Sequence, residues 1–170
     1  MATSWASLGD IERFRGNWDE AERLYRQCLQ IEEELGDRAG MAAVWGQLGD
    51  IERLKGNLDA AEQLKRQSFQ IRQELGDREG MANSLGAWGD IERDRGNWDE
   101  AEHLYQQCLQ ISQELGLNYK IAETNYDLAQ LWRKRGNEEV AQEHYNTAYQ
   151  IFQQLGAAKD LERIEKEWNE

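Results

Sequence analysis

The sequence predicts an all-α repeat protein in which helical hairpins stack side by side as an α-solenoid. Three observations lead to this prediction. A 40-residue pattern recurs in register, since 25 of the 40 residues of 1–40 return in 41–80 and 26 of 40 return in 81–120. Proline is absent, and residues that lose little conformational freedom in helices dominate between the glycines. A fixed period of this size is typical of solenoids, whose units contact mainly their neighbours.

Each repeat opens with a predicted helix, which we call helix A, that ends at a glycine. In the first repeat Trp5, Leu8 and Ile11 form an apolar stripe at helical spacing, and the stripe stops at Gly16. Glycine suits the left-handed residue that often follows the C-terminus of a helix. We therefore expect helix A to end just before Gly16.

A second predicted helix, helix B, follows at once. Asn17 precedes it, with Glu20 three residues on, in a variant of the capping box. Gly36 ends the helix, and Asp37 is placed to cap the next helix A. The apolar residues of helix B step by 3 and 4, as expected for one buried face, and are Ala21, Leu24, Cys28, Ile31 and Leu35.

The repeat pattern continues towards the C-terminus. The fourth repeat keeps only 12 of the 40 residues of the first, but these include its framework positions. Leu161, Ile164 and Trp168 then mark one more helix with charges on its other side. We expect four repeats in residues 1–156 and a capping helix in 157–170 that covers the last open face. By period, the repeats are 1–40, 41–80, 81–120 and 121–160.

Charge and cysteine content restrict the partners and the compartment. The 20 basic and 33 acidic residues give a net charge of −13, which repels nucleic acids and anionic membrane surfaces. No apolar run approaches the roughly 20 residues needed to span a bilayer, and the start of the chain lacks a signal peptide pattern. Cys28 and Cys108 share a slot that Ser68 and Ala148 fill elsewhere, so we expect free thiols chosen for size. These features predict a cytoplasmic protein without nucleic-acid or membrane partners.

The order of residues within one unit resembles the tetratricopeptide repeat (TPR), whose hallmark is W-x2-L-G in helix A followed by alanine and aromatic positions in helix B. The resemblance recurs in register over nearly the whole chain. It implies a right-handed solenoid whose helices A line a concave groove that binds a peptide or protein segment. In the first repeat the matching residues are Trp5, Leu8, Gly9, Ala21, Tyr25 and Cys28.

Two features depart from the basic family pattern. The unit has 40 residues instead of 34, because helix B is longer. A helix A slot that is aromatic in the family holds Glu12, Glu52 and Glu92, and only Trp132 restores an aromatic side chain there. This long form resembles the extended arrays of Pins/LGN-type adaptors, of kinesin light chain and of bacterial multi-repeat signalling proteins.

The resemblance places one set of helix A residues in the peptide groove. Its constant part is an aspartate followed by an arginine three residues later, and both can form charged hydrogen bonds to an extended peptide. An alternative interpretation is an internal ladder, in which these residues pair with each other and with adjacent repeats. Positions 14, 54 and 94 vary, so we expect them to select the ligand. The predicted groove residues are Thr3, Asp10, Arg13, Phe14, Gln47, Asp50, Arg53, Leu54, Asn83, Asp90, Arg93, Asp94, Tyr126 and Gln130.

The sequence predicts no catalytic residue, no bound metal and no cofactor. His103 and His144 have no cysteine or second histidine at the helical spacing of metal ligands. The many carboxylates recur as parts of the framework. We therefore expect that the protein is not an enzyme.

The favoured function is a scaffold that binds a protein or peptide of basic or mixed charge in its groove. One alternative is a sensor or regulatory array excised from a larger bacterial signalling protein, and another is a consensus-like engineered repeat module with no ligand. Because the repeat starts in register at Met1, we also expect an uncovered N-terminal face and weak end-to-end self-association through it.

Overall fold

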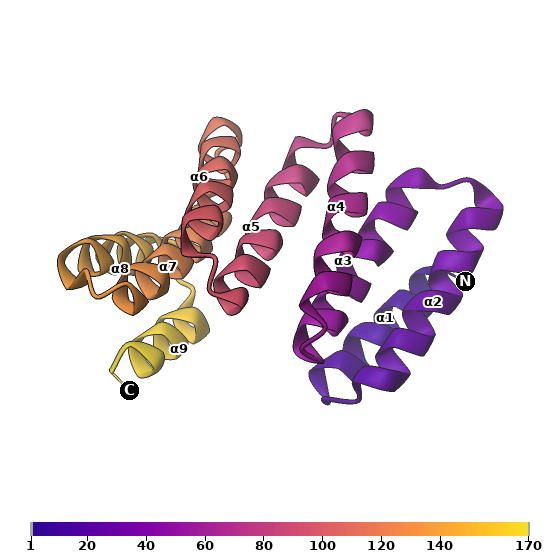
Figure 1. The fold of residues 1–170 in the computed structure, drawn as a ribbon, viewed down its shortest axis with the longest axis horizontal. Coiled ribbons are helices and arrows are strands. Elements are labelled where there is room, and N and C mark those ends of the chain that lie inside the picture. The colour runs from indigo at the N-terminus through magenta and orange to yellow at the C-terminus, as the bar shows by residue number, and fades with distance from the viewer. Residues whose placement is uncertain (1, 170) are drawn as a thin grey trace. The chain divides into compact units, whose positions relative to one another are not determined.

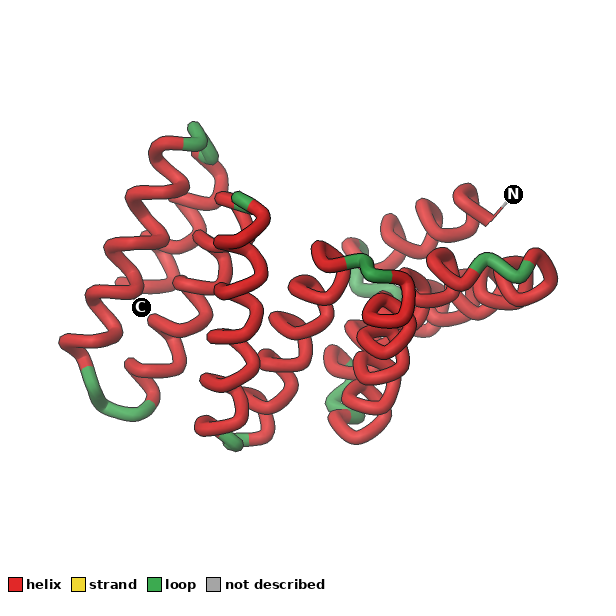
Figure 2. Tube along the Cα trace, turned by 90° about the horizontal axis from the view of Figure 1, so that it is seen from above, coloured by secondary structure: helices red, strands yellow, loops and turns green. Residues whose placement is uncertain are grey.

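A computed structural model describes the backbone of residues 2–169 and the side chains from Trp5 to Asn169. This part of the chain is helical and contains no strand (Figures 1 and 2). The predicted all-α repeat fold is therefore confirmed. In chain order the helices are α1 (Ala2–Phe14), α2 (Trp18–Leu35), α3 (Arg38–Leu54), α4 (Leu58–Leu75), α5 (Arg78–Arg95), α6 (Trp98–Leu115), α7 (Asn118–Lys134), α8 (Glu138–Gln154) and α9 (Ala158–Asn169).

The chain divides into two compact units, residues 1–91 and 92–170, and the division falls within α5. In the first unit α1 packs on α2, α2 on α3 and α3 on α4. In the second unit α6 packs on α7, α7 on α8 and α8 on α9. Helices that are consecutive in the sequence are therefore neighbours within each unit, as short loops require.

The helices are joined by turns of one type, in which a glycine adopts the left-handed conformation. After α1, the Gly16 N–H donates to the Arg13 carbonyl at 3.1 Å and the Asn17 N–H donates to the Glu12 carbonyl at 2.9 Å. Gly16 has a φ of +78°, which favours glycine because a Cβ atom is strained there. This Schellman geometry confirms the predicted glycine turn. Positive φ recurs at 20-residue intervals, at Gly16, Gly36, Gly56, Gly76, Gly96, Gly116, Gly136 and Gly156.

The two predicted helix caps of the first repeat have different outcomes. Asp37 caps α3 as expected, because its Oδ1 accepts a hydrogen bond from the Gly40 N–H at 3.0 Å. The predicted capping box at Asn17 is wrong. The Asn17 side chain makes no capping bond, and its Nδ2 instead donates to Glu12 Oε2 at 2.6 Å. Glu12 occupies a slot that is aromatic in the family. Its carboxylate binds the Asn17 side chain, which therefore does not cap α2.

The fourth repeat supports this explanation. Trp132 stands there in the slot of Glu12 and offers no carboxylate. Asn137, the equivalent of Asn17, accepts a hydrogen bond from the Val140 N–H at 3.2 Å and so caps α8. The residue five positions upstream thus decides whether this asparagine caps its helix.

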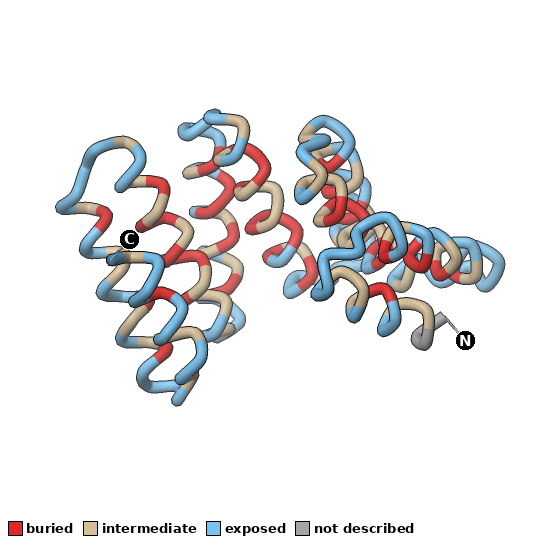
Figure 3. Tube along the Cα trace, turned by 90° about the horizontal axis from the view of Figure 1, so that it is seen from below, coloured by how far each residue is buried: buried red, intermediate tan, exposed pale blue. Residues whose placement is uncertain are grey.

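The core of residues 1–91 lies between successive helices, and buried positions recur along α2, α3 and α4 (Figure 3). Helix α2 must approach α1 closely, because a Cβ atom at Gly9 would lie only 2.7 Å from the Tyr25 ring. This contact explains why the hallmark glycine of helix A is small. One cluster joins α2 to α3 through Ala21, Tyr25, Cys28, Val44, Leu48 and Ile51.

The core of residues 92–170 is richer in aromatic side chains. Tyr145 of α8 stacks on Trp168 of α9 with ring centroids 4.5 Å apart, and Tyr119 meets Phe152 edge to face. Ile164 of α9 is fully buried in the same cluster. These contacts hold α9 against α7 and α8. Cys28 and Cys108 are both buried, and neither forms a disulfide.

Candidate functional site

The charged residues of α1 are held in place by a tyrosine of α2. Tyr25 is fully buried, and its hydroxyl donates to Asp10 Oδ1 at 2.7 Å. Burial and the Asp10 carboxylate raise the pKa of Tyr25, while the Arg13 guanidinium opposes this shift. The Arg13 guanidinium also lies over the Phe14 ring, 4.6 Å from its centroid. Two predicted groove residues, Asp10 and Arg13, therefore interact with one buried hydroxyl, and Phe14 is linked to them through Arg13.

The equivalent residues of α3 are held by a buried lysine of α4. Lys65 occupies the slot of Tyr25, is only 3% exposed, and donates from Nζ to Asp50 Oδ1 at 2.6 Å and to the Gly46 carbonyl at 2.7 Å. Burial lowers the pKa of Lys65, and the nearby Arg53 lowers it further, whereas Asp50 and Asp90 raise it. The structure thus brings three predicted groove residues, Asp50, Arg53 and Asp90, together around Lys65.

These contacts bear on the two interpretations of the Asp and Arg row. Asp10 and Asp50 accept hydrogen bonds from helix B rather than from the arginine three residues later. Within residues 92–170, Arg93 donates to Asp127 of α7 at 3.2 Å, which is the kind of bond between adjacent repeats that an internal ladder contains. The Asp50 side chain nevertheless remains 32% exposed while it is bonded. Internal bonds therefore fix these side chains and leave part of their surface open.

One of the two predicted groove residues of α7, Tyr126, is buried against α9, whereas Gln130 stays partly exposed. Tyr126 is 2% exposed, and its hydroxyl donates to Glu167 Oε2 at 2.8 Å. Burial and this bond raise the pKa of Tyr126 to about 12. Gln130 Nε2 also approaches Glu167 Oε2, at 3.5 Å, and Arg133 donates to the Trp168 carbonyl at 2.8 Å. A peptide could reach Tyr126 only if α9 moved.

The remaining predicted groove residues differ in exposure. Phe14 is 80% exposed and Leu54 is 39% exposed, so both variable positions face solvent. Asn83 and Asp94 are also exposed, and Gln47 is partly exposed. The side chain of Thr3 lies outside the described residues.

Sequence reasoning missed Lys65, although a signal for it was present. The column at positions 25, 65, 105 and 145 reads Tyr, Lys, Tyr and Tyr, so the charge appears where the period breaks on helix B. The groove residues that the sequence predicts all lie on helix A. The partners of Asp10 and Asp50 each lie fifteen residues further along the chain, on a different helix.

The surface is also hollowed at two equivalent turns that the sequence did not single out. A shallow recess of about 630 Å³ is lined by residues 16–20 and Lys55, and one of about 520 Å³ by residues 96–100 and Arg135. Each contains a partly exposed tryptophan, Trp18 or Trp98. Both recesses lie at the start of a helix B and are therefore separate from the helix A residues described above.

Comparison with known families identifies the class of protein. The tetratricopeptide repeat model matches residues 1–74 and 80–154, which together make up most of the chain. The chain belongs to the tetratricopeptide repeat family. It is therefore a protein–protein interaction module, as members of this family bind proteins or peptides.

Solved structures show the same fold at low sequence identity. BtubC (BKLC) from P. vanneervenii is similar with a TM-score of 0.77 and 23% identity, over 88% of this chain and 61% of that one. Aspartyl phosphate phosphatase F from Bacillus subtilis is similar with a TM-score of 0.88 and 12% identity, over 96% of this chain and 43% of that one. The chain thus spans less than two thirds of either neighbour. No relative was found among curated proteins.

Two further observations concern the described residues as a whole. None of their helices has the length and apolar character that crossing a bilayer requires. Within the same residues, no three histidine, cysteine, aspartate or glutamate side chains gather in an arrangement that could hold a metal ion.

Proposed function

We propose that the helix A face of residues 1–91 binds an extended peptide or protein segment of basic or mixed charge. The observation that carries this proposal is the pair of aspartates that helix B holds in place, Asp10 through Tyr25 and Asp50 through Lys65. A charged group that is fixed before binding loses less side-chain entropy when a ligand arrives. Family membership supports the proposal because tetratricopeptide repeats are interaction modules.

The chemistry of the face supports a ligand of mixed charge. Its aspartates can accept hydrogen bonds from lysine, arginine or backbone N–H groups, and Arg13 and Arg53 can hold a carboxylate in two parallel bonds. The Nε atom of Arg13 is buried and makes no hydrogen bond within the described residues. The chain's net charge of −13 attracts a basic segment over longer distances. We place the protein in the cytoplasm, where free thiols such as Cys28 persist.

The test uses random 12-residue peptides displayed on phage, selected against the purified chain. Peptides that are enriched should bind in solution, and the double variant Arg13→Ala/Arg53→Ala should weaken their binding at least tenfold. The loss is expected because each arginine supplies a charge-assisted hydrogen bond. Isothermal titration of the enriched peptides measures the change.

The matched control is Arg23→Ala/Arg26→Ala, which removes the same charge from exposed positions of α2. These arginines form ion pairs with Glu20 and Glu22 of their own helix. Binding within twofold of the unmodified chain supports the helix A face. If no peptide is enriched, or if both double variants lose affinity equally, the proposal fails and a repeat module without a ligand becomes the better interpretation.

A further inference from the structure

Gly46 lies in the middle of α3, and no contact within the described residues requires a glycine there. A Cβ atom at position 46 would meet only Ser68 Oγ, at 3.6 Å, which is an ordinary van der Waals distance. The backbone of Gly46 is regular helix, since the positive φ values belong to the turn glycines. An alanine would therefore fit at this position without strain.

The other glycines of residues 5–80 each have a structural reason. Those that follow a helix have a positive φ, which a residue with a Cβ atom adopts only with strain. Within α1, a Cβ atom at Gly9 would lie 2.7 Å from the Tyr25 ring, and within α3 one at Gly40 would lie 2.6 Å from the Glu32 side chain. A side chain of helix B stands close in the same way against Gly49 and Gly80.

The repeat does not demand a glycine at this position either. The equivalent residue of α1 is Ala6, and that of α7 is Tyr126, which is buried against α9. Both helices therefore accept a side chain there. Glycine destabilises the interior of a helix relative to alanine. The fold of residues 1–91 thus gives no reason for the glycine of α3.

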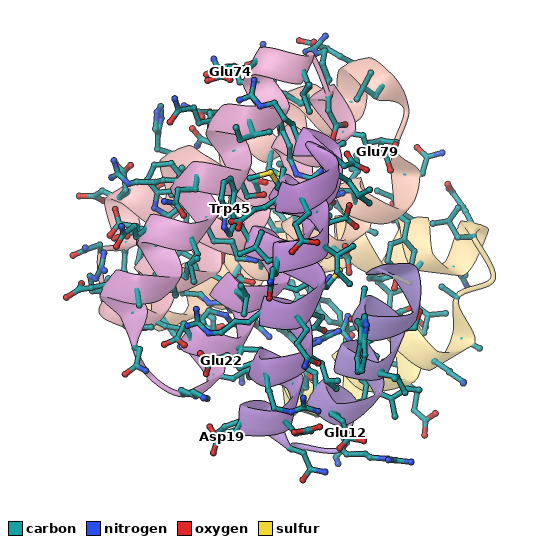
Figure 4. All side chains as sticks on the ribbon, turned by 90° about the vertical axis from the view of Figure 1, so that its right-hand side faces the viewer. Glu12, Asp19, Glu22, Trp45, Glu74 and Glu79 are labelled. Atoms are coloured by element: carbon teal, nitrogen blue, oxygen red, sulfur yellow. The ribbon has the colours of Figure 1, made fainter. Side chains whose placement is uncertain are left out.

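The surroundings of Gly46 belong to the proposed peptide site. Asp50 lies one turn further along α3, on the same side of the helix, and its side chain is 32% exposed. Lys65 holds both positions, because its Nζ donates to the Gly46 carbonyl at 2.7 Å and to Asp50 Oδ1 at 2.6 Å. Gly46 is partly exposed, whereas the preceding residue, Trp45, packs against the core cluster of α2 and α3 (labelled in Figure 4).

We propose that a peptide bound at this site passes with its main chain in van der Waals contact with Gly46. This inference rests on the peptide site proposed above and adds its point of closest approach. The missing Cβ atom lets the ligand come nearer to α3. There the Asp50 carboxylate, held by Lys65, can accept a hydrogen bond from a peptide N–H group. The ligand is an extended segment, because a helix surrounds its main chain with side chains.

The experiment measures how the phage-enriched peptides bind to chains that carry a side chain at position 46. Gly46→Ala should weaken binding about threefold and Gly46→Leu about thirtyfold, because the loss grows with the volume placed between helix and ligand. Gly46→Ala should also raise the midpoint of thermal unfolding by about 3 °C, because alanine favours the helix. A glycine that serves binding predicts this opposite change in affinity and stability.

The matched control is Ala60→Leu, which adds a large side chain at an exposed position of α4. Its affinity for the same peptides should stay within twofold of the unmodified chain. Isothermal titration measures the affinities, and circular dichroism checks that each variant is folded. Gly46→Ala alone decides the test if Gly46→Leu does not fold.

Several results would overturn the inference. If Gly46→Ala binds as tightly as the unmodified chain while Arg13→Ala/Arg53→Ala still weakens binding, the peptide site stands and the close approach at Gly46 is wrong. A lower unfolding midpoint in Gly46→Ala would show that the fold itself needs the glycine. Equal losses in Gly46→Leu and Ala60→Leu would show an effect that is not specific to this face. If no peptide is enriched, the peptide site and this inference fail together.

Discussion

The first two helical pairs share a backbone plan but solve one contact with different chemistry. In α1 and α2 a neutral phenol, Tyr25, reaches Asp10, whereas in α3 and α4 a buried ammonium, Lys65, reaches Asp50. The surrounding slots are nearly the same, since Gly9 and Gly49 face these side chains and Ala21 and Ala61 flank them. The repeat therefore determines where Asp10 and Asp50 are held, while the residue on helix B determines the energetic cost of holding them.

The largest expected difference comes from removing each carboxylate charge. Asp50→Asn should lower the free energy of unfolding by about 2 to 3 kcal/mol, because it leaves the Lys65 ammonium buried without its counter-charge. Asp10→Asn should cost about 1 kcal/mol, because an amide oxygen can still accept from Tyr25. Urea unfolding of the two variants measures both values. Equal losses would show that Lys65 is not held by Asp50 in solution.

A smaller effect is expected when α4 is given a tyrosine at position 65, as α2 has at position 25. Lys65→Tyr should raise the free energy of unfolding by about 1 kcal/mol at pH 7, because replacing a buried ion pair with a well-packed side chain often stabilises. Gly49 leaves the same kind of space for a ring that Gly9 leaves for Tyr25. A destabilised variant would mean that α3 and α4 cannot accept the arrangement of α1 and α2.

The pH dependence of that gain follows from the lysine. Burial lowers the pKa of Lys65 in the folded protein below its ordinary value of 10.5. Between the two pKa values the unfolded chain binds more protons, so the stability of the unmodified protein rises with pH in this window. The advantage of Lys65→Tyr should therefore be smaller at pH 9.5 than at pH 7. An advantage that grows with pH would contradict the lowered pKa.

The smallest expected difference concerns the two hallmark glycines. Gly9→Ala places a methyl group 2.7 Å from the rigid Tyr25 ring, whereas Gly49→Ala places one 3.0 Å from the flexible Lys65 stem. We expect Gly9→Ala to destabilise by about 1 kcal/mol and Gly49→Ala to change stability by less than about 0.5 kcal/mol, since the helix propensity of alanine offsets a mild contact. Thermal unfolding midpoints compare the two. A larger loss in Gly49→Ala would show that the lysine stem is as rigid as the ring.

The fold could be predicted from the sequence because its signals are local and repeated. Gly16 and Asp37 act through the residues next to them, and both behave as expected. Asn17 does not, because Glu12 competes for its amide once the turn brings the two together. The departure of the Glu12 slot from the family pattern is visible in the sequence, but its effect on capping depends on the turn that brings Glu12 and Asn17 together.

The candidate site was less predictable because it depends on contacts between helices. The positions of Asp10 and Asp50 on helix A followed from the family resemblance. Their partners on helix B depend on how two helices pack, which a pattern on one helix does not specify. The same holds for Tyr126, whose cover by α9 arises from a bond to Glu167, 41 residues further on.

The turn glycines recur every 20 residues, which is half of the sequence period. The turns that follow a helix A and a helix B therefore have the same spacing and the same glycine conformation. The two kinds of helix differ only in their side chains. Duplication or loss of 20 residues would keep the glycine turns in step, yet it would place the side chains of a helix A where those of a helix B pack. The 40-residue period is thus a requirement of the side chains and not of the turns.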